Sequence, residues 1–167
     1  MKPEFLKLNP MHTVPTLELD NGDGLYESRL ILKYLDGMYS GEHASAFEVD
    51  KWLFWDLGFL STNVGKVIYP RLFLNSEPTE KDVGRLVEKL EHLDSHLEKN
   101  KFLADSKVTI ADLSCLAQVQ NSQIRKDLAD VSGYANITRW MADVQSVFSQ
   151  EDWDAVMADF LKWKDSL

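Results

Sequence analysis

Strand-like alternation of polar and apolar residues is confined to one short stretch of this chain, between residues 16 and 27. Residues 16–19 alternate in this way, a glycine-containing turn follows at residues 20–24, and Leu25 and Tyr26 come directly after it. Two short runs around such a turn predict an antiparallel β-hairpin. We therefore expect a mainly helical protein in which this hairpin supplies the sheet.

The rest of the chain has the three-to-four-residue apolar spacing of amphipathic helices. A short helix is expected before the hairpin, and another over residues 28–39 directly after it. Pro70 is expected to kink or stop the first long helix, because proline has no N–H to donate. We expect an α/β unit of residues 1–40 and an all-α unit of residues 41–167. Its helices are predicted at residues 45–69, 80–100, 106–121, 134–148 and 151–163.

Composition excludes several classes of function. The 167 residues carry 18 Lys and Arg against 27 Asp and Glu, a net charge of −9, whereas nucleic-acid binding requires clustered positive charge. The sequence has no run of about 20 apolar residues and no apolar leader, so neither a membrane span nor a signal peptide is expected. The single cysteine, Cys115, cannot form an internal disulfide and favours the cytosol.

Residues on both sides of the hairpin form a candidate ligand site. Val14 and Pro15 enter the first strand, Glu27 and Ser28 leave the second, and His12 lies just upstream. A cis bond before the proline would keep the backbone N–H and C=O of Val14 out of the sheet, free to pair with an extended peptide. At a helix start, Ser28 could donate to a carboxylate and Glu27 could accept from an amine, which suits the α-amino-acid end of a ligand. The alternative is that Ser28 only caps the helix and the proline only delimits the strand.

Other motifs favour structural roles. His92 and His96 are four residues apart, but no third ligand accompanies them, so we prefer a solvated helix flank and expect no metal. Cys115 lies at an apolar helical position and is expected to be an inert buried thiol. An aromatic cluster on the first long helix is expected to be mostly core: Trp52, Phe54, Trp55, Phe59 and Tyr69.

Three motifs occur in order along the chain: KPEFLKLNPMHTVPTL at residues 2–17, LYESR at residues 25–29 and TIAD at residues 109–112. Their combination resembles the cytosolic glutathione S-transferases, nearest the delta and epsilon classes typical of insects. The resemblance covers nearly the whole chain. It implies a truncated thioredoxin-like α/β piece, made of a helix, a β-hairpin and a helix, followed by the family's all-α C-terminal domain.

The resemblance also implies a role for each candidate residue at the hairpin. Val14, before the family's cis-proline Pro15, would pair its backbone with the cysteinyl part of glutathione. Glu27 and Ser28 would hold the γ-glutamyl end, with Arg29 nearby, and His12 would reach toward the thiol or the glycine end. Thr109 and Asp112 would cap a buried helix reciprocally, as a structural device. A pocket for an apolar electrophile would lie along the first long helix, for which we nominate Leu57, Leu60, Val64, Ile68 and Tyr69.

Such transferases are implied to be cytoplasmic homodimers that conjugate glutathione, their co-substrate, to small apolar electrophiles in detoxification. In the family, a Ser or Tyr hydroxyl at the end of an opening strand ionises the thiol. The 15 residues before Thr16 are too few for an opening strand–helix–strand unit, so we expect the catalytic hydroxyl to be absent from this chain and conjugation to be slow. The alternative function is a non-catalytic interaction or ligand-carrying module of the same family.

Overall fold

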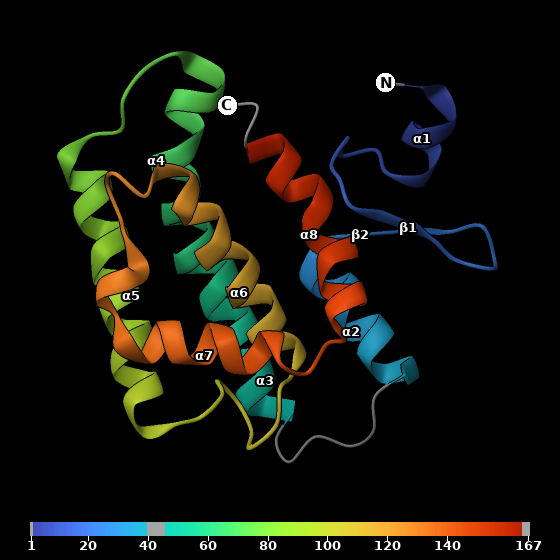
Figure 1. Ribbon diagram of the computed structural model, residues 1–167. Coiled ribbons are helices and arrows are strands. Elements are labelled where there is room, and N and C mark those ends of the chain that lie inside the picture. Colours follow the sequence, from blue (N-terminus) through green and yellow to red (C-terminus); the bar gives the residue numbers. More distant parts are fainter. Residues whose placement is uncertain (1, 40–45, 165–167) are drawn as a thin grey trace. The chain divides into compact units, whose positions relative to one another are not determined.

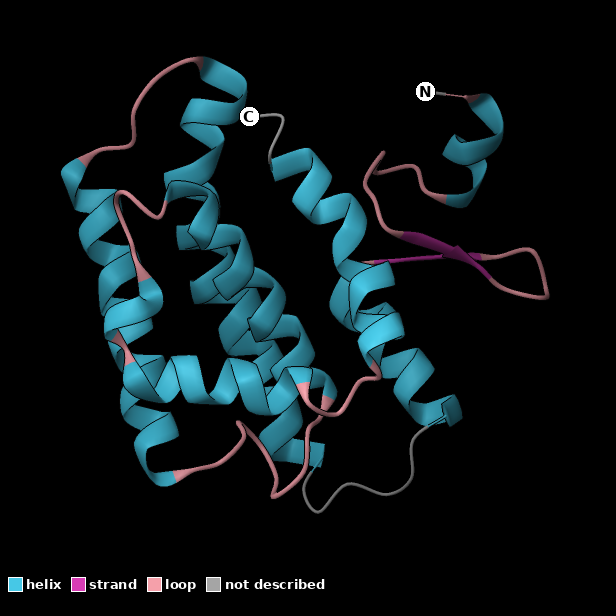
Figure 2. Ribbon diagram, viewed as in Figure 1, coloured by secondary structure: helices cyan, strands magenta, loops and turns pink. Residues whose placement is uncertain are grey.

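The computed structural model describes residues 2–39 and 46–164. The chain divides into two compact units, Met1–His43 and Ala44–Leu167 (Figure 1). The expected boundary between residues 40 and 41 lies outside the described residues, as does the expected start of the first long helix at residue 45. Figure 2 shows the two strands in the first unit and helices through the second.

The first unit is built on one hairpin. Its elements are α1 (Pro3–Leu8), β1 (Thr16–Glu18), β2 (Gly24–Tyr26) and α2 (Ser28–Tyr39). The strands pair antiparallel, with Thr16 opposite Tyr26 and Glu18 opposite Gly24, which confirms the predicted hairpin. A Cβ at Gly24 would lie 1.9 Å from the carbonyl oxygen of Leu8, so β2 passes directly against the end of α1.

The described residues of the second unit form helices joined by loops. Its elements are α3 (Ala46–Trp55), η1 (Asp56–Leu60), α4 (Ser61–Leu74), α5 (Glu80–Lys99), α6 (Ile110–Ser122), η2 (Gln123–Arg125), η3 (Val131–Gly133), α7 (Ala135–Gln145) and α8 (Gln150–Lys164). α4 packs against both α5 and α6, while α3 packs against α6 and α7 against α5. The apolar stripe of α5 consists of Leu86, Leu90, Leu93 and Leu97, all fully buried. No helix in the described ranges is long and apolar enough to cross a bilayer.

The first long helix differs from its prediction in two ways. It contains a π-helical turn, η1, which is fixed to α6 by the Ser114 hydroxyl donating to the buried carboxylate of Asp56. Of the two effects expected of Pro70, a kink or a stop, the stop is excluded, because Pro70 lies inside α4. Proline removes only the bond to the carbonyl four residues earlier, so one further turn forms before the left-handed Asn75 ends the helix.

Two further expectations for this unit were wrong. α6 begins at Ile110 and not at residue 106, because Thr109 has extended backbone angles and serves as its N-cap. Of the aromatic cluster only Trp52 is buried, whereas Phe54 is 70% exposed. The helical period that turns Trp52 inward with its neighbours Val49 and Leu53 turns Phe54 outward. Cys115 is fully buried, as expected.

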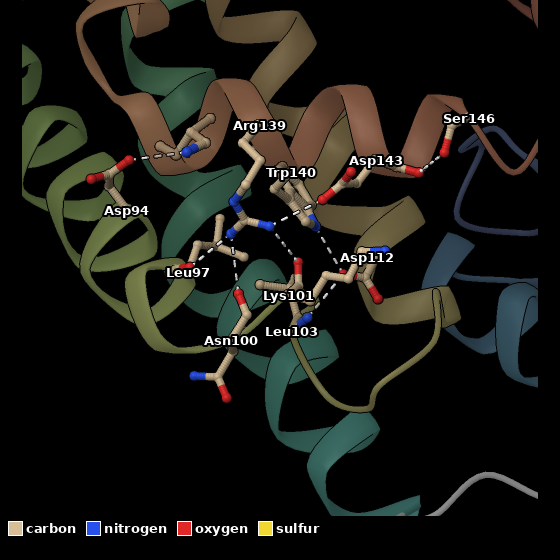
Figure 3. A network of polar contacts seen from close by, with 11 residues as sticks. Asp94, Leu97, Asn100, Lys101, Leu103, Asp112, Arg139, Trp140, Asp143 and Ser146 are labelled. Atoms are coloured by element: carbon tan, nitrogen blue, oxygen red, sulfur yellow. Dashed lines mark hydrogen bonds and ion pairs between the residues drawn. The ribbon is translucent and has the colours of Figure 1, made fainter.

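Buried Asp112 joins three parts of the helical unit (Figure 3). It completes a capping box with Thr109, whose N–H it accepts at 2.9 Å while the Thr109 hydroxyl accepts from Ala111 N–H. Its other oxygen accepts from the backbone N–H of Leu103 and the indole N–H of Trp140, both at 2.9 Å. A fully buried carboxylate is stabilised only when its oxygens are satisfied in this way.

α5 and α7 cap each other reciprocally. Asp94 on α5 accepts the backbone N–H groups of Asn136 and Ile137 at 2.9 Å each, at the start of α7. Arg139 on α7 donates to the carbonyl oxygens of Leu97 and Asn100, at 2.7 and 3.2 Å, at the end of α5 (Figure 3). The carboxylate meets the positive end of one helix dipole and the guanidinium meets the negative end of the other.

Candidate functional site

The hairpin register brings the two halves of the candidate ligand site to one end of the sheet. Because Thr16 lies opposite Tyr26, the residues just before Thr16 and just after Tyr26 leave the hairpin at the same end. Those residues are Val14 and Pro15 on one side and Glu27 and Ser28 on the other. Antiparallel pairing thus makes neighbours of two segments that are 12 residues apart in the sequence.

The backbone of Val14 is available for hydrogen bonding at this end of the hairpin. The bond between Val14 and Pro15 is cis, and the Val14 side chain is 79% exposed. Within the described residues neither the N–H nor the C=O of Val14 forms a hydrogen bond. An exposed donor and acceptor on one residue can pair with an extended peptide segment, as strands do at a sheet edge.

Glu27 and Ser28 lie where β2 meets α2. Glu27 has a φ of 76°, in the left-handed region that L-residues seldom occupy, and its carbonyl accepts the N–H of Ile31 at 3.0 Å. Glu27 therefore takes the N-cap place that the sequence suggested for Ser28, which is the first residue of α2. The Ser28 hydroxyl accepts from Nη1 of Arg29 at 3.0 Å. Unusual backbone angles of this kind gather at ligand-binding positions.

His12 is exposed on the loop between α1 and β1. It also has positive φ, 60°, and its backbone N–H donates to the carbonyl of Asn9 at 3.2 Å. The loop thus carries His12 and Val14 on one short turn of chain.

Asn9 holds that loop in place and was missed in the sequence analysis. It is fully buried, and its Nδ2 donates to the Thr13 carbonyl at 2.8 Å and to the hydroxyls of Thr13 and Thr16 at 3.0 Å each. Its Oδ1 accepts the N–H of Met11 at 2.9 Å. The last bond is an Asx turn, and the available signal was an asparagine at the end of a short helix followed by proline.

A hollow of about 590 Å³ lies on one face of α4 within the helical unit. Of the five nominated pocket residues the structure brings Leu57 and Tyr69 to it, while Leu60, Val64 and Ile68 are buried in the core. The reason is helical phase. Residues spaced by four from Leu57 share its face of the helix, so Ser61, Gly65 and Tyr69 also line the hollow. This four-residue spacing is the sequence signal that could have predicted the lining residues.

Gly65 shapes this hollow through Tyr69. A Cβ at Gly65 would lie 2.9 Å from Cε2 of Tyr69, so the tyrosine ring lies directly against the glycine.

Among the described residues no group of three or more His, Cys, Asp or Glu side chains could hold a metal ion.

Comparison with known proteins shows the family to which the chain belongs. Residues 1–38 match the model of the glutathione S-transferase N-terminal domain, and residues 63–147 match that of the C-terminal domain. A delta-class glutathione transferase from Nilaparvata lugens is 37% identical, with a TM-score of 0.76, over 87% of this chain and 70% of that one. This chain belongs to the glutathione S-transferase family.

Two further solved structures extend over nearly the whole chain. A Bombyx mori glutathione transferase in complex with GTT is 28% identical, with a TM-score of 0.86, over 99% of this chain and 78% of that one. An epsilon-class enzyme from the housefly Musca domestica is 29% identical, with a TM-score of 0.81, over 99% and 79%. The insect delta and epsilon classes are therefore its structural neighbours, as the sequence motifs indicated.

Proposed function

We propose that this chain binds glutathione at the open end of its hairpin. The observation that carries the proposal is the juxtaposition, fixed by the Thr16–Tyr26 register, of the unpaired Val14 backbone with the Glu27–Ser28 helix start. A γ-glutamyl tripeptide has an amino-acid head and an extended peptide, and these two features match the two halves of the site.

Each half of the proposed site has groups that can bind one part of glutathione. The carboxylate of Glu27 suits the α-ammonium of the glutamyl head. Its α-carboxylate suits the Ser28 hydroxyl, the Arg29 guanidinium and the N-terminal end of α2, because a helix N-terminus favours negative charge. Val14 pairs with the cysteinyl peptide group, and His12 lies toward the thiol or the glycine end.

We assign the electrophile to the hollow on α4. Leu57, Tyr69, Pro70 and Leu74 give it an apolar lining, and its volume of about 590 Å³ suits a small apolar molecule. Full members of the family conjugate such molecules to the glutathione sulfur.

In this assignment Ser28 serves the glutamyl end, so the proposed binding residues include no hydroxyl for the thiol. A polypeptide of these 167 residues is therefore expected to bind glutathione while conjugating it slowly. Assay of a standard aromatic electrophile tests this expectation. Turnover equal to that of a complete insect transferase would contradict it.

Retention on immobilised glutathione tests the binding site itself. Glu27→Gln and Ser28→Ala should each weaken retention about tenfold, because each removes a hydrogen bond to a charged group of the ligand. Glu18→Gln, an exposed carboxylate on the same hairpin, is the matched control and should be retained like the unaltered chain. Equal retention of all three variants would overturn the proposal.

We propose in addition that the chain is a cytoplasmic homodimer. Support comes from family membership and from exposed aromatic side chains on α3, of which Phe54 and Phe47 are the most exposed.

A further inference from the structure

A pocket of the helical unit lies between α6 and α7, separate from both proposed subsites. Leu116 and Gln120 of α6, Met141 and Gln145 of α7 and Trp153 of α8 line it, together with the loop between α6 and α7. We call it the α6–α7 pocket. Its volume of about 350 Å³ is at the lower end for small-molecule sites, and it shares no residue with the hollow on α4.

The middle of the α6–α7 pocket is apolar and its ends are polar. One face of α7 contributes, in order along the helix, Thr138, Met141, Ala142 and Gln145. Apolar side chains therefore lie between two polar ones on this wall. Leu116 and Val131 are buried and extend the apolar floor. Such a floor suits a C–H surface, with hydrogen-bonding groups left for the edge of a ligand.

Two carboxamides in the wall are available to a ligand. Within the described ranges neither the Gln120 nor the Gln145 side chain forms a hydrogen bond, and both residues are half-buried. A primary amide carries both donors and an acceptor. A hydroxyl also donates and accepts, so a hydroxylated ligand can pair with either end of each amide.

The charged groups at the rim balance each other. Lys126 and Asp130 both line the pocket, with Nζ and Oδ2 3.7 Å apart. The Asp130 carboxylate accepts the backbone N–H of Ser132 at 2.9 Å, and this hydrogen bond lowers the pKa of Asp130. Both groups are therefore charged at neutral pH. A ligand with a net charge would be attracted by one and repelled by the other, whereas a neutral ligand is repelled by neither.

Gln123 fixes the loop that carries these charges. Its Nε2 donates to the carbonyl of Ala129 at 3.0 Å, and its Oε1 accepts the N–H of Val131 at 3.4 Å. Because both ends of this amide are used, Gln123 shapes the wall and leaves recognition to Gln120 and Gln145. A wall that is ordered before binding loses little conformational entropy when the ligand arrives.

Trp153 gives the pocket one aromatic surface. It lies in the first turn of α8, is half-buried, and packs against Phe148 with ring centroids 5.8 Å apart. A flat indole packs well against the C–H groups of a saturated ring, since many weak dispersion contacts form at once.

We propose that the α6–α7 pocket binds a neutral pyranose, the ring of a free hexose or of a simple hexoside. One C–H face of the sugar lies on the apolar floor and against Trp153. Its hydroxyls, which surround the ring, pair with Gln120, Gln145 and the charged pair at the rim. A pyranose combines these properties: two C–H faces, no net charge, and edge groups that all donate and accept. This site does not depend on the proposed glutathione site.

NMR titration of the isotope-labelled whole chain tests the proposal through the side-chain amide signals of Gln120 and Gln145. The neutral probes are D-glucose and methyl β-D-glucopyranoside, whose ring hydroxyls are equatorial and leave C–H groups on both faces. Both should shift these signals saturably, with a millimolar Kd because one small ring forms few contacts. Saturation by only one of them would support the pocket and show whether it takes the free hexose or the hexoside.

Three comparison probes separate a sugar site from a less specific one. Cyclohexanol keeps a C–H ring with a single hydroxyl, D-glucuronate adds a negative charge and D-glucosamine a positive one. Each should bind more weakly than the neutral sugars, and saturating glutathione should not reverse the shifts. No saturable shift with either neutral sugar, or equal binding of any comparison probe, would overturn the proposal.

Variants locate the binding. Gln120→Leu and Gln145→Leu keep the size of the side chain and remove its hydrogen bonds, so each should weaken the methyl glucoside about fivefold, measured at the Trp153 indole signal. Gln118→Leu, a half-buried glutamine on α6 that does not line the pocket, is the matched control and should have no effect. Affinities equal to that of the control in both pocket variants would place the sugar elsewhere and refute the assignment.

Discussion

Asn9 shows how one buried side chain can hold the loop of the proposed glutathione site. Its amide reaches Thr13 and Thr16 while its oxygen holds Met11, so the loop that presents Val14 is tied at three points. Family motifs in the sequence led us to propose the exposed site residues. They missed Asn9 because its role depends on which acceptors the folded loop brings around it.

Asn9→Ala should reduce the free energy of unfolding by about 2 kcal/mol and weaken retention on glutathione, because it leaves buried hydrogen-bonding groups without partners. Urea denaturation and glutathione retention measure the two effects. Asn21→Ala, at an exposed turn where the amide donates only to Asp23, is the control and should change neither. Full retention by a destabilised Asn9 variant would show that the loop is not positioned by this residue.

His96 should make the helical unit less stable in mild acid. Burial lowers its pKa in the folded state below the ordinary value of 6.5, so the unfolded chain binds the proton more readily. The contribution of neutral His96 to the free energy of unfolding is therefore complete above pH 6.5. It decreases as the pH falls from 6.5 toward the pKa that His96 has in the folded state. Thermal unfolding between pH 7.5 and 5.5 measures the slope, which His96→Phe should flatten. An equally steep slope in that variant would contradict this assignment.

Helices were predictable as elements because each carries a periodic apolar stripe, as α5 does through Leu86 and Leu97. Their ends were less predictable, since a boundary depends on the groups that satisfy the terminal N–H and C=O. α6 starts at Ile110, after the capping box of Thr109 and Asp112 that the TIAD motif implied, whereas α4 runs past Pro70 to its cap at Asn75. The π turn η1 had no sequence signal, as its anchor on Ser114 is 58 residues away.

The reciprocal caps between α5 and α7 should contribute more than ordinary surface ion pairs. Asp94→Ala should lower the free energy of unfolding by about 1–3 kcal/mol, because two backbone N–H groups of α7 lose a charged acceptor. Asp143→Ala removes the half-buried i,i+4 partner of Arg139 and should cost about 0.5 kcal/mol or less. Urea denaturation followed by circular dichroism compares them, and similar losses would contradict the capping role.

The whole molecule combines a small α/β unit that carries the proposed glutathione site with a larger helical unit that carries the hollow on α4. Motif order along the chain was sufficient to predict this family and architecture. The pocket residues were harder to predict, because the face that each residue occupies depends on the phase of a helix interrupted by η1.

The proposed homodimer should be visible in solution. Sedimentation velocity at micromolar concentration is expected to give a mass near twice 19.1 kDa, and Phe54→Ser should shift the equilibrium toward monomer by removing exposed apolar area on α3. A monomer at all concentrations would contradict this proposal without affecting the glutathione site.

Calorimetric titration of the chain with the two dipeptide halves of glutathione tests most directly that the hairpin end holds the amino-acid head. γ-Glutamylcysteine carries the head and the cysteinyl peptide group, whereas cysteinylglycine lacks the head. We predict measurable binding of γ-glutamylcysteine that Ser28→Ala weakens, and no measurable binding of cysteinylglycine. Binding of cysteinylglycine alone, or of both halves with no effect of Ser28→Ala, would contradict the account.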